Sequence, residues 1–319
     1  MILPGNLNAA VAHLVEAQKD LRVSTQVLAK AYRAGKDSGH VNLGAYLATR
    51  VPATFAANMR VLAELKSLRP EFSPRSLLDV GAGPGTASWA SLHHWPELGT
   101  VGQVEKLPSF RGLAGELNLK SELSALLGAQ VFAGDVLKLA TGLKSDLVIA
   151  SYVLAELPLH EIESAVANLW RYSSDVLVLI EPGTPGGFGR LRLARDKLLA
   201  ANAHVLAPCT HSAVCPMTGA DWCHFKVRVQ RSRAHMLAKN AVVPFEDEAF
   251  SYLVLQRQVS NIGGARVLSP PDVNKIAVSL RLCTEQGVST QQIASRNKAL
   301  YKQAKKISWG GLWKADDER

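Results

Sequence analysis

Apolar residues near the N-terminus recur at helical spacing. Leu7, Val11, Leu14 and Leu21 follow one another at steps of four, three and seven residues, so they share one helix face. Alanine, leucine and lysine, which favour helices, are frequent in the same part of the chain. The pattern predicts a helical segment over residues 1–70.

Glycine and proline divide this helical segment. Gly35–Gly39 predicts a break between two helical stretches. A second helical run, Thr54–Leu68, follows Pro52, and we expect it to begin after that proline. Pro70 and Pro74 then mark the boundary before the first strand.

From residue 76 onward, short apolar runs alternate with helical stretches, and a further helix is expected over Arg190–Ala203. The predicted strands are Ser76–Val80, Val101–Glu105, Gln130–Ala133, Asp146–Ala150 and Asp175–Glu181. Because strands that alternate with helices form parallel sheets, the pattern predicts an α/β fold with a doubly wound, Rossmann-like sheet.

After this alternation the pattern becomes irregular. Residues 204–225 are rich in cysteine, histidine and proline and fit neither period. Phe250–Gln258 and Ala277–Cys283 are predicted strands, and Gln291–Lys306 is a predicted basic helix. We therefore divide the chain into an N-terminal helical segment, a Rossmann-like core, and a third part with a Cys-rich loop, the remaining strands and the basic helix, at residues 1–70, 71–203 and 204–319.

A glycine-rich loop joins the first predicted strand to a helix. Glycines let the backbone turn tightly and approach a ligand, and the helix N-terminus supplies free N–H groups. Dinucleotide loops usually have the spacing G-x-G-x-x-G. Here the spacing is Asp79-x-Gly81-x-Gly83-x-Gly85, which is similar to the first motif of class I methyltransferases. S-adenosylmethionine is therefore favoured over a nicotinamide cofactor.

Acidic residues end the next two predicted strands. Glu105 lies about 20 residues beyond the last glycine, where an acid binds a ribose diol in either fold. Asp135 follows the third strand, where the acid of the methyltransferase pattern faces the adenine amino group. The ordinary alternatives are a solvated strand end and a turn residue. The predicted cofactor contacts are Asp79, Gly81, Ala82, Gly83, Gly85, Glu105, Asp135, Val136, Ser151 and Tyr152.

The segment after the fourth predicted strand does not identify a catalytic residue. Enzymes that methylate amines carry an Asn/Asp-Pro-Pro-aromatic motif there, and Ser151–Leu157 lacks it. Glu156 and Glu181, near strand ends, are candidate bases, with solvated or capping roles as alternatives. Pro208–Cys209 is similar to the nucleophile motif of cytosine-C5 methyltransferases. It follows the fifth strand instead of the fourth, so we reject that interpretation.

Four cysteines indicate a metal site. They all lie in the C-terminal half, at Cys209, Cys215, Cys223 and Cys283. Thiolates bind both zinc and iron–sulfur clusters. The C-x5-C-x7-C spacing differs from the paired C-x2-C of structural zinc and from the triplet of radical S-adenosylmethionine enzymes. His211 and His224 can replace a cysteine in a zinc site, so the residues leave the metal open.

The charge of the chain indicates a polyanionic partner. Its net charge is +9 and its pI about 9.4. The cations are concentrated in three segments, which favours nucleic acid over the alternative of an ordinary basic enzyme. The predicted RNA contacts are Arg190, Arg192, Lys226, Arg228, Arg231, Arg233, Lys298, Lys302 and Lys305.

The sequence also bears on location. No stretch approaches the ~20 apolar residues that span a bilayer, and the first residues lack the pattern of a signal or transit peptide. We therefore expect a cytoplasmic protein without membrane contact, monomeric when free. In that compartment cysteines are metal ligands or free thiols more often than disulfides.

Several motifs together resemble one family. The chain is similar to the methyltransferase-like assembly factors of the mitochondrial small ribosomal subunit and their bacterial relatives. The motifs that carry the resemblance are Tyr46-Leu47-x-x-Arg50-x-Pro52-Ala53-Thr54, Leu78–Thr86, Glu181–Gly187, Ala207–Cys209, Cys215–Pro216, Asp221–Phe225, Glu246–Glu248, Phe250–Leu253, Cys283 and Trp309–Gly310.

The resemblance implies three properties. The equivalent four cysteines of the family bind a 4Fe-4S cluster, which favours that cluster over zinc. The family associates with the small ribosomal subunit and its rRNA during assembly. Without a mitochondrial presequence, a bacterial, cytoplasmic member is expected.

Two functions remain open: an rRNA methyltransferase with a structural cluster, and a non-catalytic assembly factor that binds rRNA. A small-molecule methyltransferase is a weaker third possibility, because such a substrate does not require the basic segments.

Overall fold

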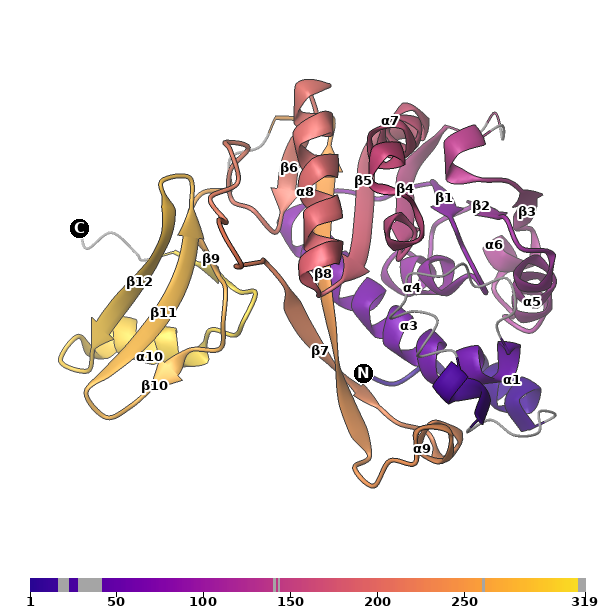
Figure 1. The fold of residues 1–319 in the computed structure, drawn as a ribbon, viewed down its shortest axis with the longest axis horizontal. Coiled ribbons are helices and arrows are strands. Elements are labelled where there is room, and N and C mark those ends of the chain that lie inside the picture. The colour runs from indigo at the N-terminus through magenta and orange to yellow at the C-terminus, as the bar shows by residue number, and fades with distance from the viewer. Residues whose placement is uncertain (17–22, 28–41, 140–141, 143, 260–261, 315–319) are drawn as a thin grey trace.

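The computed structural model describes residues 1–16, 23–27, 42–139, 142, 144–259 and 262–314. The predicted break at Gly35–Gly39 and the apolar Leu21 lie outside these residues. Figure 1 shows a main body built around one sheet and a smaller C-terminal lobe beside it. Among the described residues, no helix combines the length and apolar character required to cross a membrane.

The sheet of the main body has the strand order β3-β2-β1-β4-β5-β8-β6, with β7 paired to β8. Its strands are β1 (Ser76–Val80), β2 (Thr100–Glu105), β3 (Gln130–Ala133), β4 (Ser145–Ser151), β5 (Ser173–Pro182), β6 (His204–Ala207), β7 (Phe225–Gln230) and β8 (Phe245–Gln256). Strands β1 to β5 are parallel, and β8 runs antiparallel to β5 and β6. This confirms the predicted Rossmann-like fold of class I methyltransferases. The first five predicted strands are correct to within two residues.

Helices cover both faces of this sheet. Successive residues of each strand point to opposite faces, so apolar strand residues require a covering layer on both. Leu77 packs in one buried cluster and Leu78 in the other. The first face carries α1 (Gly5–Glu16), α3 (Leu43–Leu68), α4 (Thr86–His94), α5 (Pro108–Leu119) and α6 (Ser124–Leu127). The second carries α7 (Ile162–Tyr172) and α8 (Pro185–Ala200). Short 3-10 turns lie at Val136–Lys138, Leu154–Glu156 and Leu159–Glu161, and residues 23–27 are helical.

Helix α3 corrects one prediction. It begins at Leu43 and continues through Pro52, so the helical run does not start after that proline. An internal proline costs about 3 kcal/mol, but Val51 and Phe55 on either side are almost completely buried. Packing of this face on the sheet offsets the cost.

Helix α8 also differs from its predicted bounds of Arg190–Ala203. It begins at Pro185, since the Thr184 side chain caps it by accepting a bond from the Gly187 N–H, and it ends at Ala200.

The C-terminal lobe is a second sheet, in the order β10-β11-β9-β13 with β12 paired to β11. Its elements are β9 (Ala265–Val267), β10 (Asp272–Val273), β11 (Ala277–Thr284), β12 (Gly287–Ala294), α10 (Lys298–Lys306) and β13 (Leu312–Trp313). The predicted helix Gln291–Lys306 is wrong in its first part, which belongs to β12. The helix starts later because Asn297 caps it by accepting a bond from the Leu300 N–H.

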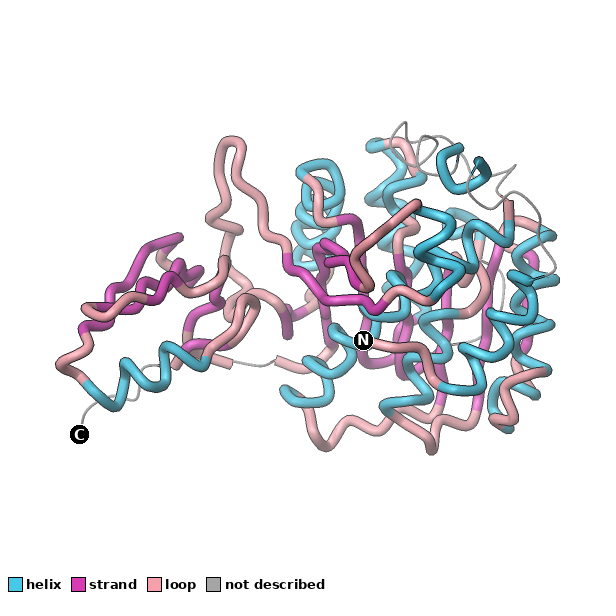
Figure 2. Tube along the Cα trace, turned by 90° about the horizontal axis from the view of Figure 1, so that it is seen from below, coloured by secondary structure: helices cyan, strands magenta, loops and turns pink. Residues whose placement is uncertain are grey.

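Strands β7 and β8 form a long hairpin arm that ends in α9 (Arg233–Lys239) and projects from the main sheet (Figure 1). The sequence analysis predicted no strand over Phe225–Gln230, where β7 lies. Figure 2 shows the main body and the C-terminal lobe from below, with the chain passing between them on loops. The four cysteines lie on or beside these connections, in the Cys-rich loop that follows β6 and on β11.

Candidate cofactor pocket and cysteine site

The glycine-rich loop has a backbone that glycine favours. Gly81 has φ +68°, and a Cβ atom there would lie 2.4 Å from Cγ2 of Val153. Gly85 has φ +83° and caps α4, and a Cβ atom there would lie 2.5 Å from the Gln103 amide nitrogen. Side chains at either position would clash with neighbouring segments, so the loop can approach both the next strand and a ligand only with glycine.

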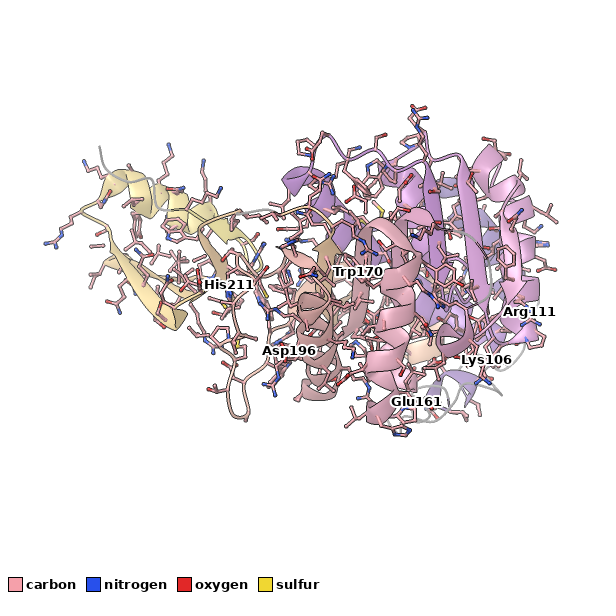
Figure 3. All side chains as sticks on the ribbon, turned by 90° about the horizontal axis from the view of Figure 1, so that it is seen from above. Lys106, Arg111, Glu161, Trp170, Asp196 and His211 are labelled. Carbon is pink, nitrogen blue, oxygen red and sulfur yellow. The ribbon has the colours of Figure 1, made fainter. Side chains whose placement is uncertain are left out.

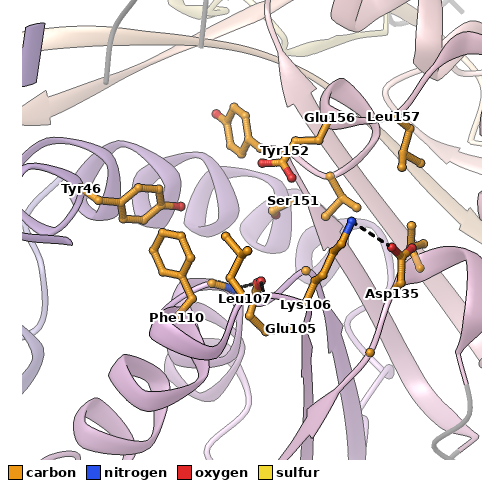
Figure 4. Close-up of a pocket in the computed structure, with 15 residues that line it drawn as sticks. Tyr46, Glu105, Lys106, Leu107, Phe110, Asp135, Ser151, Tyr152, Glu156 and Leu157 are labelled. Carbon is orange, nitrogen blue, oxygen red and sulfur yellow. Dashed lines mark hydrogen bonds and ion pairs between the residues drawn. The ribbon is translucent and has the colours of Figure 1, made fainter. Parts of the chain in front are cut away.

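A pocket lies at the carboxyl ends of β1 to β4, where ligands bind in doubly wound sheets. Figure 4 shows its lining side chains. Of the predicted cofactor contacts it gathers Gly81, Gly83, Glu105, Asp135, Val136, Ser151 and Tyr152. Asp79, Ala82 and Gly85 do not line it, although they lie in the same strand and loop. The structure thus brings most of the predicted set to one place.

Two of the pocket acids are held by backbone N–H groups. Glu105 accepts a bond from the Gly83 N–H at 2.9 Å and another from the Leu107 N–H at 2.8 Å. Asp135 accepts from the Leu137 N–H at 2.9 Å and pairs with the Lys106 ammonium at 3.5 Å, as Figure 4 shows. Both carboxylates are therefore fixed at the pocket, and each has further acceptor capacity for a hydroxyl or amino group.

Asp79 fixes the helix that follows the glycine-rich loop. Its carboxylate is buried and accepts bonds from the Ser88 N–H at 3.0 Å and the Ser88 hydroxyl at 2.8 Å. Burial raises its pKa from 3.8 to about 6, although the two bonds oppose this shift. The side chain therefore fixes the first turn of α4 against β1.

Replacing Asp79 by asparagine should stabilise the chain at alkaline pH. Between about pH 4 and 6 the folded wild type binds more protons than the unfolded chain, so its stability falls as pH rises through this window. Asparagine can accept both Ser88 bonds and does not ionise. We expect Asp79→Asn to be more stable than wild type by about 1–3 kcal/mol at pH 8, and about equally stable at pH 4.

Urea unfolding at the two pH values measures this difference. Glu97→Gln, at an exposed position, is the matched control and should show no pH-dependent gain. If the free energy of unfolding of Asp79→Asn differed from that of wild type by the same amount at both pH values, the raised pKa of Asp79 would be contradicted.

The structure adds pocket residues that the sequence analysis missed. Tyr46 of α3 and Phe110 of α5 line the same pocket, with ring centroids 4.8 Å apart and planes at 65°. Lys106 and Leu107 also contribute. Tyr46 opens the first motif of the family resemblance, which is the one signal that could have found it. The N-terminal segment therefore forms one wall of the pocket.

The loop after β4 is held by internal bonds. The Ser151 hydroxyl donates to the Asn58 side chain at 2.9 Å. Tyr152 has a left-handed backbone, with φ +62°, and its hydroxyl donates to Glu248 at 2.9 Å. The Arg50 guanidinium pairs with Glu248 at 3.2 Å. Side chains at the position of the missing amine-binding motif thus bond to α3 and to the arm.

Glu181 anchors the same loop. Its buried carboxylate accepts bonds from the Leu154 and Ala155 N–H groups at 2.8 and 2.9 Å. Burial raises its pKa to about 8, against the effect of both bonds. These two bonds therefore favour the capping role that was the alternative for Glu181 over the role of a base. Glu156, the other candidate, lines the pocket.

All four cysteines line one small cavity between the main body and the C-terminal lobe. Cys209, Cys215 and Cys223 come from the loops after β6, and Cys283 comes from β11. Burial raises the pKa of Cys209, Cys223 and Cys283, the last to about 12, and charge on the other cysteines adds to each shift. Burial therefore disfavours the thiolate form of these three cysteines.

Neither predicted histidine lines this cavity. His211 lies where the loops approach α8, near the labelled Asp196 in Figure 3. The ring of His224 stacks on that of Trp222, with centroids 5.1 Å apart, and contacts the Trp309 ring edge-on, with centroids 4.9 Å apart. Among the described residues, no three His, Cys, Asp or Glu side chains are grouped so as to hold a metal ion.

The predicted RNA contacts fall into two groups. Arg192, Lys226, Arg228, Arg233, Lys298, Lys302 and Lys305 are exposed. Arg228 also pairs across the arm with Asp247 at 2.9 Å. The other two serve the fold: Arg231 pairs with Glu246 at 2.9 Å, and Arg190 donates to the carbonyls of Leu154 and Leu157.

Comparisons with known proteins find relatives of similar sequence. The chain is 29% identical over 291 residues to the human protein "Ribosome assembly protein METTL17, mitochondrial", covering 84% of this chain and 61% of that protein. It is 26% identical to the Schizosaccharomyces pombe "Rsm22-cox11 tandem protein 2, mitochondrial", covering 84% of this chain and 42% of that protein. The chain thus spans less than two thirds of either relative.

A solved structure described as a putative RNA methyltransferase from Pyrococcus horikoshii matches at 15% identity with a TM-score of 0.41, covering 64% of this chain and 83% of that one. The model of the family "Mitochondrial small ribosomal subunit Rsm22" matches residues 41–314, which include the pocket walls and all four cysteines. The chain therefore belongs to the Rsm22 family.

Proposed function

We propose that this chain acts in assembly of the small ribosomal subunit, as an S-adenosylmethionine-binding, iron–sulfur-containing, methyltransferase-like protein that binds rRNA. The observation that carries the proposal is the pocket that joins the glycine loop to Glu105 and Asp135 at adjacent strand ends. Family membership and the description of the human relative as a ribosome assembly protein support the biological role.

The pocket suits the proposed cofactor chemically. Glu105 has acceptor capacity for a ribose diol, and Asp135 for an adenine amino group. The faces of Tyr46 and Phe110 offer an apolar wall for a planar ring. When bound, the cofactor would supply an activated methyl group, while these residues orient it.

The donor set of the cysteine cavity supports the proposed 4Fe-4S cluster. Four thiols, from the Cys-rich loop and from β11, line one cavity. Four cysteine thiolates are the usual ligands of such a cluster. When bound, the group would link the Cys-rich loop to β11 of the C-terminal lobe. Zinc held by the same cysteines is the alternative metal.

The exposed cations support contact with rRNA. Lys298, Lys302 and Lys305 lie on α10, and Lys226 and Arg228 lie on the outer strand of the arm. Lys226 lies 5.5 Å from the centre of the Trp309 ring. Cations beside an aromatic ring suit a phosphate backbone with an unpaired base.

A non-catalytic assembly factor is the second candidate, and one observation favours it. Ser151 and Tyr152, at the position where amine methyltransferases hold their target, bond instead to Asn58 and Glu248. A chain of this kind would bind cofactor and rRNA without methyl transfer.

Glu105→Ala tests cofactor binding and turnover together. The variant loses the carboxylate proposed for the ribose diol and the acceptor for the Gly83 N–H. We expect cofactor affinity to fall at least tenfold, about 1.4 kcal/mol, by calorimetry. Glu116→Ala, on α5 and outside the pocket lining, is the control. An unchanged affinity in Glu105→Ala would contradict the assigned pocket.

Methyl-labelled cofactor and immature small subunits distinguish the two candidates. Label that passes to rRNA with wild type and not with Glu105→Ala indicates a methyltransferase. Tight binding of both ligands without transfer indicates the assembly factor. A wild-type chain that binds neither cofactor nor the immature subunit would refute both.

A further inference from the structure

Arg195 of α8 is a buried cation that lines the cysteine cavity. Its side chain is 4% exposed. One nitrogen, Nη2, donates to the carbonyls of His211 and Ala213, between Cys209 and Cys215. Nε and Nη1 are buried and have no hydrogen-bond partner among the residues that the structure describes. The guanidinium is therefore fixed by one nitrogen while two others remain available.

Among the residues that the structure describes, no buried carboxylate pairs with this guanidinium. The carboxylate paired with it, Asp196, lies 3.8 Å from Nη1, beyond hydrogen-bond distance, and is 62% exposed. Arg266, the second buried guanidinium near the cysteines, differs because Glu64 pairs with it at 2.7 Å. A buried charge without a partner costs several kcal/mol. The cavity next to Arg195 should therefore hold the compensating negative charge.

We propose that Arg195 provides the counter-charge and N–H donors for a thiolate-bound cluster in the cysteine cavity, and that it raises the reduction potential of this cluster. The inference rests on the proposed iron–sulfur site. Four thiolates give the bound group a net negative charge, which increases on reduction. A buried cation stabilises the reduced form more, and hydrogen bonds to the sulfurs act in the same direction.

The bonds of Arg195 agree with this role. Cys209 and Cys215 line the same cavity as Arg195, and each lies two residues from a carbonyl that Nη2 of Arg195 binds. These bonds hold the guanidinium beside the Cys-rich loop. Arg192, one turn earlier, also lines the cavity, but it is exposed, and its Nη1 donates to the Met217 carbonyl at 3.4 Å.

Arg195→Gln tests the proposal through the potential of the cluster. Wild type and variant are purified and reconstituted anaerobically, analysed for iron and sulfide, and titrated with dithionite while the cluster absorption is followed. We expect the midpoint potential of Arg195→Gln to fall by at least about 59 mV, a tenfold shift toward the oxidised cluster. Lys197→Gln removes the same charge from an exposed position on α8 and should shift the potential far less.

Arg195→Lys separates charge from shape, because it keeps the cation and loses the planar fork. If Arg195→Gln cannot retain iron, we expect Arg195→Lys to retain it, with cofactor affinity showing that both variants are folded. Loss of iron from both folded variants would mean that Arg195 only braces the loop, which overturns the proposal.

Two further results would overturn it differently. Full iron content with an unchanged potential in Arg195→Gln would refute the role of Arg195 and leave the cluster in place. A wild-type chain that takes up no iron would refute the proposed cluster, and this inference with it.

Discussion

Replacing Cys215 by serine should prevent binding of the proposed cluster and destabilise the chain. The serine hydroxyl is a poor ligand for iron, and the remaining thiols leave one iron without its ligand. A group that binds only the folded state stabilises it by about 4 kcal/mol when present at a thousand times its Kd. The Tm should therefore fall by roughly 8 °C or more, with iron content at least tenfold lower.

Val214→Ser is the matched control for this change. Val214 precedes Cys215 and is 86% exposed, so the same side chain is introduced beside the cavity without loss of a ligand. Its iron content and Tm should equal those of wild type. Binding to immature subunits should fall in Cys215→Ser and not in Val214→Ser, because the cysteine loop adjoins the basic arm. A Cys215→Ser protein with normal iron and normal Tm would contradict the cluster site.

Replacing Arg266, on β9 of the C-terminal lobe, by methionine should cause a large loss of stability. Arg266 is 1% exposed and joins three segments. It pairs with Glu64 of α3 and donates to the carbonyls of Pro208 and Gly310. Methionine leaves the Glu64 carboxylate half-paired and both carbonyls unsatisfied. Breaking a buried pair in this way costs about 3–5 kcal/mol.

Arg60→Met tests whether burial causes this effect. Arg60 pairs with the same Glu64 carboxylate, at 2.9 Å, but its side chain is 34% exposed. An ion pair of this type contributes about 0–1 kcal/mol. Urea unfolding should therefore separate the two variants by at least about 2 kcal/mol. Equal losses in both would show that Arg266 does not hold the C-terminal lobe to the main body.

The sequence predicted the parts of the fold in which a local pattern decides the structure. The five parallel strands are short apolar runs between helices, and burial on both faces produces such runs. Pro52 misled the prediction because packing of α3 overrides a local cost. Gln291 and its neighbours are polar because this part of β12 is exposed, so polarity and charge there did not distinguish a strand from the basic helix that follows.

The pocket was predictable where its residues follow strand ends. Gly81, Glu105 and Asp135 each occupy a position that the order of strands fixes. Tyr46 and Glu248 reach the same region from α3 and from the arm. The spacing of residues along the sequence does not predict such a contact. Arg195 was missed for the same reason: in the sequence it is one cation of the predicted helix Arg190–Ala203, and only the fold shows it buried beside the cysteines.

Iron and sulfide analysis of anaerobically purified protein, together with its visible absorption spectrum, tests the central claim most directly. We predict a brown protein with about four irons and four sulfides per chain, as a 4Fe-4S cluster bound by Cys209, Cys215, Cys223 and Cys283 requires. A colourless protein with about one zinc per chain would contradict the cluster, and with it the proposed role of Arg195 in setting a potential.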